Sequence, residues 1–142
     1  MENIHTIILV LSIIFMWAPM LRPPVHKILR NRKTYTGFMY FSILLPIISF
    51  ATWNIDLPEN EKSSAFMAFY PIIYLVMYKI FDNIILKKYN RHLIYTVKYN
   101  VLWVDDESDN AKSLDNLFEF LLIMVPILIP WGLSFLILKY CC

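Results

Sequence analysis

The fold of this chain is decided by residues 117–138, LFEFLLIMVPILIPWGLSFLIL. From Phe120 this stretch runs for nineteen residues without a charge, close to the length a helix needs to cross a hydrocarbon core of about 30 Å. A helix on the surface of a soluble protein is apolar along one face, whereas this stretch is apolar on every side. We therefore predict a transmembrane helix, because a segment surrounded by lipid must satisfy its own backbone hydrogen bonds.

The composition of the whole chain agrees with a membrane location. Its 142 residues are 58% hydrophobic and 16% aromatic, with a mean hydropathy of +0.53, which is more apolar than soluble domains usually are. The formal charge of +2 is too small for nucleic-acid binding through the field of the whole molecule. The sequence predicts an all-α integral membrane protein in which residues 1–142 form one polytopic domain.

Four apolar stretches are separated by polar segments, and we predict transmembrane helices at residues 4–21, 35–55, 64–86 and 114–138. Ser63 or Ser64 is placed to cap the third helix, and Ser113 to cap the fourth, with Asp115 in its first turn. Prolines interrupt every predicted span except the first, either as static kinks or as breaks of the kind found in transporters and gates: Pro46, Pro71, Pro126 and Pro130.

Charge in the connecting loops sets the predicted topology. The first loop contains five basic residues and no acidic residue, Arg22, Lys27, Arg30, Arg32 and Lys33, which makes it cytoplasmic by the positive-inside rule. The same loop also fits an amphipathic helix lying on anionic lipid headgroups. The loop at residues 54–62 is acidic and predicted to be external. Both termini are then outside, and a bacterial inner membrane is the predicted location.

The segment between the third and fourth spans begins with LIYTVKYNVLWV at residues 93–104. Twelve residues are too few to span a bilayer as a helix, so we predict a short ordered cytoplasmic element, either a strand pair or an amphipathic piece. The acidic residues that follow resemble the start of a calcium loop, but Asn110 and Asn116 occupy its glycine and glutamate positions. No metal, cofactor or enzymatic motif is predicted.

Polar residues inside the third and fourth spans are the candidate site. Three tyrosines and an aspartate recur every fourth residue and form one ridge, Tyr70, Tyr74, Tyr78 and Asp82. The ridge either lines a water-filled path or packs against neighbouring helices. Lys79 and Glu119 are predicted at the same depth as Asp82, and they either form an ion pair between helices or have a functional role.

These features favour a non-enzymatic membrane protein that binds another membrane protein, as an accessory subunit or as an immunity or regulatory factor. In layout the four helices resemble the small polytopic immunity proteins of pore-forming bacteriocins, although no motif carries the resemblance. The alternative is a self-assembling pore or a small transporter. The predicted partners are membrane lipids and a membrane protein or a second copy of the chain, with no nucleic acid.

We predict that the chain crosses the membrane four times, so that Asn31 and Asn110 face one side and Asn60 faces the other. Single cysteines at these positions, in a chain whose Cys141 and Cys142 are replaced by serine, would be tested with a thiol reagent that cannot cross membranes. Labelling of Asn60→Cys from the same side as Asn31→Cys would contradict the topology.

Overall fold

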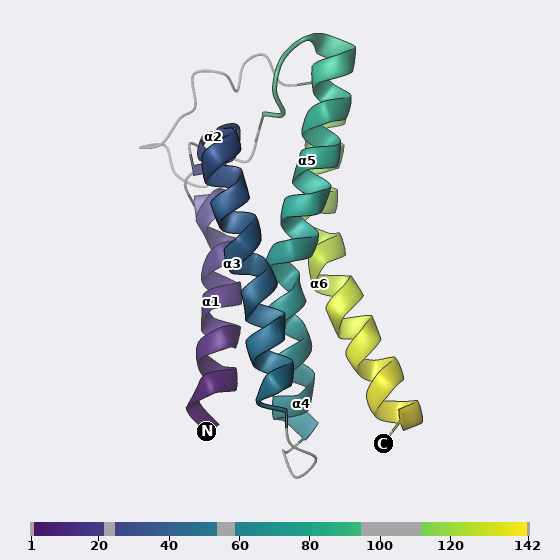
Figure 1. The fold of residues 1–142 in the computed structure, drawn as a ribbon. Helices are drawn as coiled ribbons and strands as arrows, with labels where there is room; N and C mark the ends of the chain where they lie inside the picture. The colour runs from purple at the N-terminus through teal and green to yellow at the C-terminus, as the bar shows by residue number, and fades with distance from the viewer. Residues whose placement is uncertain (1, 22–24, 54–58, 95–111, 142) are drawn as a thin grey trace.

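A computed structural model describes residues 2–21, 25–53, 59–94 and 112–141. Regular secondary structure in these residues is entirely helical (Figure 1). The elements are α1 (Glu2–Leu21), α2 (Val25–Ile28), α3 (Arg32–Ala51), α4 (Glu59–Phe66), the 3₁₀ helix η1 (Met67–Phe69), α5 (Tyr70–Tyr89) and α6 (Ser113–Cys141). The predicted element at residues 93–104 lies almost wholly outside the described residues, as do Arg22 and Asn110.

The helices form an elongated bundle whose two termini lie at the same end (Figure 1). Elements α4, η1 and α5 make one continuous helical run, and this run packs against α1, α3 and α6. Three described helical segments are long and apolar enough to cross a membrane, Arg32–Ala51, Met67–Tyr89 and Ser113–Tyr140, and Ile4–Phe15 is a shorter apolar one. The predicted all-helical architecture with four helical rods is therefore confirmed for the described part of the chain.

The third helical run begins earlier than predicted. Helix α4 starts at Glu59, so Ser63 lies inside it and caps nothing; its hydroxyl instead donates to the Ser134 hydroxyl of α6, 3.4 Å away. Farther along, the run tightens into η1 just before Pro71. Proline has no N–H to donate to the carbonyl four residues earlier, and the amide of Tyr70 bonds to the oxygen of Met67 instead.

Large side chains hold the helices together. Phe15 of α1 packs edge-on against Tyr74 of α5, with ring centroids 5.8 Å apart, and Phe81 of α5 stacks on Phe118 of α6 at 4.3 Å. Glycine is common where membrane helices approach closely, yet a Cβ atom added at Gly37 would meet nothing within 4 Å, and the same holds for Gly132. Neither glycine serves close packing in this bundle.

The helices end at different levels, and this produces a step at one end of the bundle. Helices α3 and α5 both have 20 residues, so the step arises from their offset along the bundle. In Figure 1 the upper end of α5 extends beyond α2 and the start of α3. We call this place the step; the chain leaving α5 descends into it.

Core packing at α6 is expected to contribute strongly to stability. Leu122 is fully buried, whereas Leu136 on the same helix is 52% exposed. Leu122→Ala should lower the free energy of unfolding by about 2–5 kcal/mol because it leaves a cavity, and Leu136→Ala should change it by less than about 0.5 kcal/mol. Reversible unfolding in mixed micelles measures both values, and equal effects would contradict the described packing of α6.

Candidate functional site

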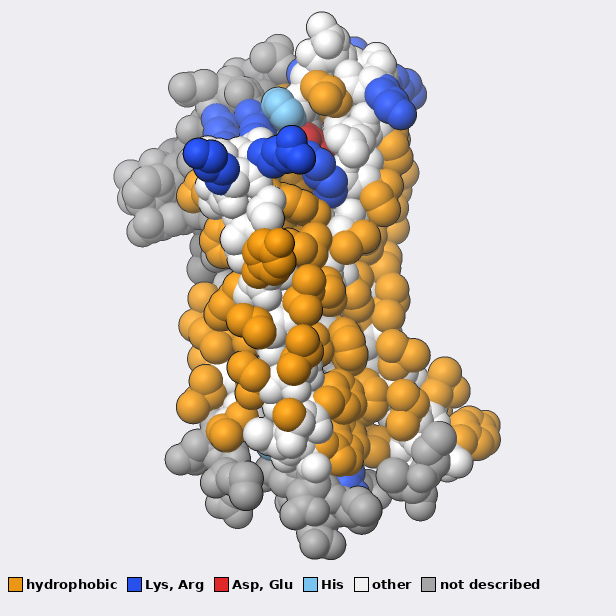
Figure 2. Space-filling view, viewed as in Figure 1, with side chains coloured by type: hydrophobic (Ala, Val, Ile, Leu, Met, Phe, Trp, Pro, Cys, Tyr) orange, Lys and Arg blue, Asp and Glu red, His pale blue; other side chains and the backbone are white. Residues whose placement is uncertain are grey.

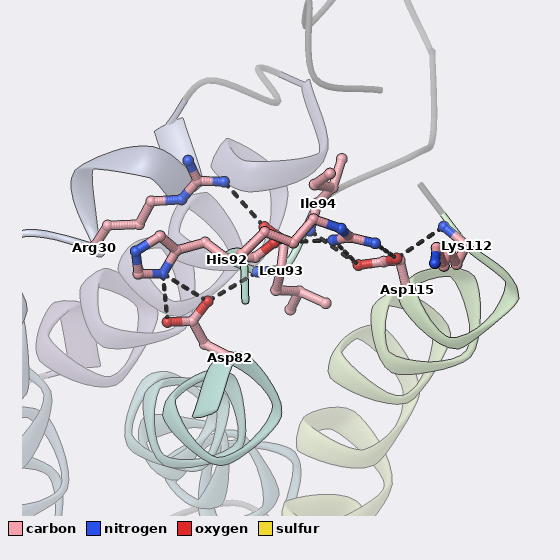
Figure 3. A network of polar contacts seen from close by, with 8 residues as sticks. Arg30, Asp82, His92, Leu93, Ile94, Lys112 and Asp115 are labelled. Atoms are coloured by element: carbon pink, nitrogen blue, oxygen red, sulfur yellow. Dashed lines mark hydrogen bonds and ion pairs between the residues drawn. The ribbon is translucent and has the colours of Figure 1, made fainter. Parts of the chain in front are cut away.

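Two buried carboxylates organise a polar network in the step, which we define as Arg30, Asp82, Arg91, His92 and Asp115 (Figure 3). Helix α5 ends at Tyr89, and Asn90 adopts a left-handed conformation with φ of 53°. Asparagine tolerates this conformation better than most residues. The chain therefore reverses sharply, and the short segment that follows lies against both α5 and α6.

Asp82 of α5 holds the middle of this segment. Its two carboxylate oxygens lie 3.1 and 3.0 Å from Nδ1 of His92, and one of them accepts the backbone N–H of Leu93 at 2.9 Å. Asp82 is only 3% exposed, so these contacts replace the water that a buried carboxylate loses.

Asp115 of α6 holds the two ends of the same segment. The Arg91 guanidinium donates to both of its oxygens, at 3.0 and 2.6 Å, in the forked geometry that makes arginine–carboxylate pairs strong. The same carboxylate accepts the backbone N–H groups of Ile94 and Lys112. The amide of Lys112 immediately precedes α6, so Asp115, rather than the predicted Ser113, satisfies the beginning of this helix.

Arg30 connects the first half of the chain to this network. Its guanidinium donates to the backbone oxygen of Leu93 at 3.1 Å and also hydrogen-bonds to the side chain of Tyr78. Arg30 lies two residues beyond the end of α2, so three parts of the chain far apart in sequence meet at residues 91–94. The network is therefore a tertiary contact and not a feature of one loop.

The tyrosine ridge is buried inside the bundle. The exposed fractions are 3% for Tyr70, 2% for Tyr74, 0% for Tyr78 and 3% for Asp82. Tyr70 and Tyr74 stack on each other with centroids 6.2 Å apart, and Tyr74 and Tyr78 belong to the main core cluster. The ridge is therefore buried against neighbouring helices of the same chain, as in the contact of Tyr74 with Phe15.

Lys79 and Glu119 lie in different surroundings in the structure. Lys79 is exposed, and its ammonium lies over the ring of Tyr35 on α3, 5.5 Å from the centroid. Glu119 is 3% exposed on α6. The reason is rotation about the axis of α5: Lys79 projects toward α3, whereas Phe81 projects toward α6, where it stacks on Phe118. Equal depth in a bundle does not place two side chains on the same face.

Chemically, the network positions backbone and side chains. An aspartate that bonds to a histidine can orient the imidazole for acid–base chemistry, but this also requires a nucleophile or substrate within reach. Among the described residues, the hydrogen-bond partner of the His92 side chain is Asp82. Among these residues, no group of three His, Cys, Asp or Glu side chains is placed to hold a metal ion.

Within the part of the chain that the structure describes, two apolar hollows flank the central run. The larger, which we call the aromatic groove, has a volume of about 640 Å³ and is lined by Phe50, Trp53, Phe66, Phe69, Leu133 and Ile137. It therefore lies between the end of α3 and the last turns of α6, with α4 and η1 as its floor. The smaller, of about 210 Å³, is lined by Leu9, Ser12, Ile13, Met67, Tyr70 and Ile127.

Sequence reasoning missed most of the polar network. It identified Asp82 as a polar group of the third span and Asp115 as an acid of the first helical turn, but it did not connect them. The signal was present only as a short charged segment, Arg91 and His92, between two spans that each carry an aspartate near the same end.

Comparisons with protein-family models, curated proteins and solved structures found no match to this chain.

We expect the pair of Arg91 and Asp115 to stabilise the fold cooperatively. Asp115→Asn should lower the free energy of unfolding by about 3 kcal/mol, because it removes the buried carboxylate that pairs with the Arg91 guanidinium. Arg91→Gln should also lower the free energy of unfolding. The double variant should lower it by less than the sum of the two single effects.

Unfolding of the single and double variants in mixed micelles gives the coupling energy. Asn116→Ala is a suitable control, since Asn116 is exposed on the same turn of α6 and should change stability by less than about 0.5 kcal/mol. Strict additivity of Arg91→Gln and Asp115→Asn would contradict the pairing.

Proposed function

We propose that this chain is a non-enzymatic integral membrane protein that binds a transmembrane helix of another membrane protein through the aromatic groove. It would act as an accessory subunit or as an immunity or regulatory factor. The observation that carries the proposal is the aromatic groove itself, a preformed apolar hollow of about 640 Å³ between α3 and α6.

The distribution of side chains supports a membrane location. Figure 2 has Lys and Arg gathered at the upper end of the bundle and hydrophobic side chains exposed along its length below them. Large apolar residues such as Leu44, Ile47 and Leu128 are each more than half exposed, which in water would be an unusually extended apolar surface. We place the step in the cytoplasm, or the equivalent compartment, by the positive-inside rule, with both termini outside, as in a bacterial inner membrane.

The aromatic groove is built from rings that fix one another. Phe50 and Trp53 stack in parallel with centroids 5.3 Å apart, and Phe66 meets Phe50 edge-on at 5.6 Å and Trp53 at 5.7 Å. Such mutual packing restricts the rings to one arrangement before any partner arrives, which lowers the ordering cost of binding. Exposed aromatic side chains are also enriched where proteins bind one another.

The wall of the groove formed by α6 is held at both ends. At the cytoplasmic end Asp115 bonds to Arg91, and near the groove Ser134 accepts a hydrogen bond from Ser63 of α4. Pro126 and Pro130 lie between these anchors, and proline bends a helix because it crowds the preceding turn. In Figure 1 the C-terminal half of α6 leans away from α3, and Leu133 and Ile137 of this half line the aromatic groove.

The alternative, a self-assembling pore or small transporter, has less support. The pore hypothesis was based on the tyrosine ridge and on Glu119. The ridge is enclosed by helices of its own chain. A water-filled path would need these hydroxyls to line an open space. The same burial favours a packing role for the ridge and leaves the outer faces of α3 and α6 for binding.

A photo-reactive amino acid at Leu133, which lines the groove, should cross-link to a membrane protein in native membranes. The same residue at Leu128 is the control, because Leu128 is 55% exposed on α6 and does not line the aromatic groove. We expect a discrete protein adduct from the first position and lipid adducts from the second. Purified protein in liposomes should carry no ion flux.

Lipid adducts alone at Leu133, in membranes of the native host, would overturn the proposal of a protein partner. Reproducible ion flux through liposomes that contain only this chain would favour the pore instead.

A further inference from the structure

The rings of the aromatic groove leave one face of the Trp53 indole without a ring against it. Phe50 stacks on the other face, with an angle of 4° between the two planes. Phe66 is nearly perpendicular to both rings and almost equally distant from each, so it lies beside the stacked pair. Among the described residues, these two are the rings that contact Trp53. Because Trp53 lines the groove and is only half-buried, an occupant of the groove can cover the remaining face.

The backbone holds Trp53 just beyond the end of α3. Its N–H donates to the backbone oxygen of Phe50 at 3.2 Å, which keeps the two rings together. Trp53 comes twenty residues after Lys33, which corresponds to roughly 30 Å at the rise of a helix. A hydrocarbon core has this thickness, so in the proposed orientation the indole lies near the outer surface of the membrane.

Negative potential gathers at this face of the indole. The face of an aromatic ring attracts cations, and tryptophan does so most strongly. The last turn of α3, which the structure describes in full, contains no basic residue, and the C-terminal end of a helix has a partial negative charge. In the described residues, Lys and Arg side chains lie over rings that do not line the groove, those of Tyr35, Tyr89, Phe135 and Tyr140.

The whole sequence also gives this end of the bundle an excess of acidic side chains. The start of α1, the chain between Trp53 and Phe66, and the end of α6 together contain four acidic and two basic residues: Glu2, Asp56, Glu59, Glu61, Lys62 and Lys139. This count includes the charged residue of the undescribed segment 54–58. The ammonium of Lys139 already lies over the rings of Phe135 and Tyr140. Charge complementarity therefore favours a partner that is basic at this end.

We propose that the membrane helix bound in the aromatic groove carries a lysine or arginine near its outer end, and that this cation lies over the open face of the Trp53 indole. A long basic side chain keeps its alkyl part against apolar residues while its charge reaches the headgroup region. This matches an apolar groove that ends in an indole near the membrane surface. The inference rests on the proposed function, because it names the kind of helix that the groove selects.

The first experiment uses the photo-reactive amino acid at Leu133 in native membranes, with mass spectrometry to identify the cross-linked protein and the helix that carries the adduct. We expect a lysine or arginine within one helical turn of the outer end of that helix. A protein adduct on a helix without such a residue would overturn this inference and leave the proposed function intact. Lipid adducts alone would overturn both, because the groove would then have no protein partner.

The affinity of the identified partner for the full-length protein in liposomes tests the contact between the cation and the ring. Trp53→Leu keeps an apolar side chain but removes the ring, and it should weaken binding about fivefold, the effect of one partly desolvated cation–π contact. Trp131→Leu is the matched control, because Trp131 is 60% exposed on α6 and does not line the groove. The control should change the affinity by less than about twofold.

Replacing the partner's basic residue with methionine separates the cation–ring contact from apolar packing. With the wild-type chain, the methionine partner should itself bind about fivefold more weakly, a result that does not depend on the folding of any variant of this protein. With the methionine partner, Trp53→Leu should change the affinity by less than about twofold, because both substitutions remove the same contact. An equal loss from Trp53→Leu with either partner would assign the indole to apolar packing and overturn the inference.

Discussion

A buried carboxylate must be neutralised or surrounded by donors, and this requirement at Asp82 and Asp115 determines how the two halves of the protein meet. Both side chains accept backbone N–H groups as well as side-chain donors, so they fix the path of the chain between α5 and α6. Because the path is fixed, α6 packs against the central run at a defined rotation, with Phe118 on Phe81. The groove at the opposite end of α6 depends on the same rotation.

The bundle separates two kinds of interaction along its axis. At the step the contacts are hydrogen bonds and charges, which have direction and set the register of the helices. Toward the termini they are aromatic, with Phe50, Trp53 and Phe66 in mutual contact. A few hydroxyl-to-backbone bonds, such as Tyr35 to the oxygen of Leu75 at 3.0 Å, connect the two regions. The polar contacts at the step therefore influence the helix positions that form the aromatic groove at the other end of the bundle.

The helical content and the approximate bounds of the helices could be predicted from the sequence, because the length and uninterrupted apolarity of each segment can be read from that segment alone. The polar network could not be predicted from the sequence, because no sequence periodicity relates residues 91–94 to Asp82 or Asp115. The position of Lys79 over Tyr35 did not follow from the sequence either, because rise along a helix gives depth, while the rotation of each helix depends on packing. Ser63 was read as a cap because local patterns favour serine there, whereas the helix had already begun at Glu59.

The connection from Arg30 to Asp115 has a consequence for biosynthesis. Residues 91–94 emerge before α6, so Arg30 and Asp82 can make their contacts with this segment before the last helix is made. The contacts of Asp115 with Arg91 and with the N–H of Ile94 form only once α6 has been made. A chain truncated before α6 would therefore keep the first set of contacts and lack the second.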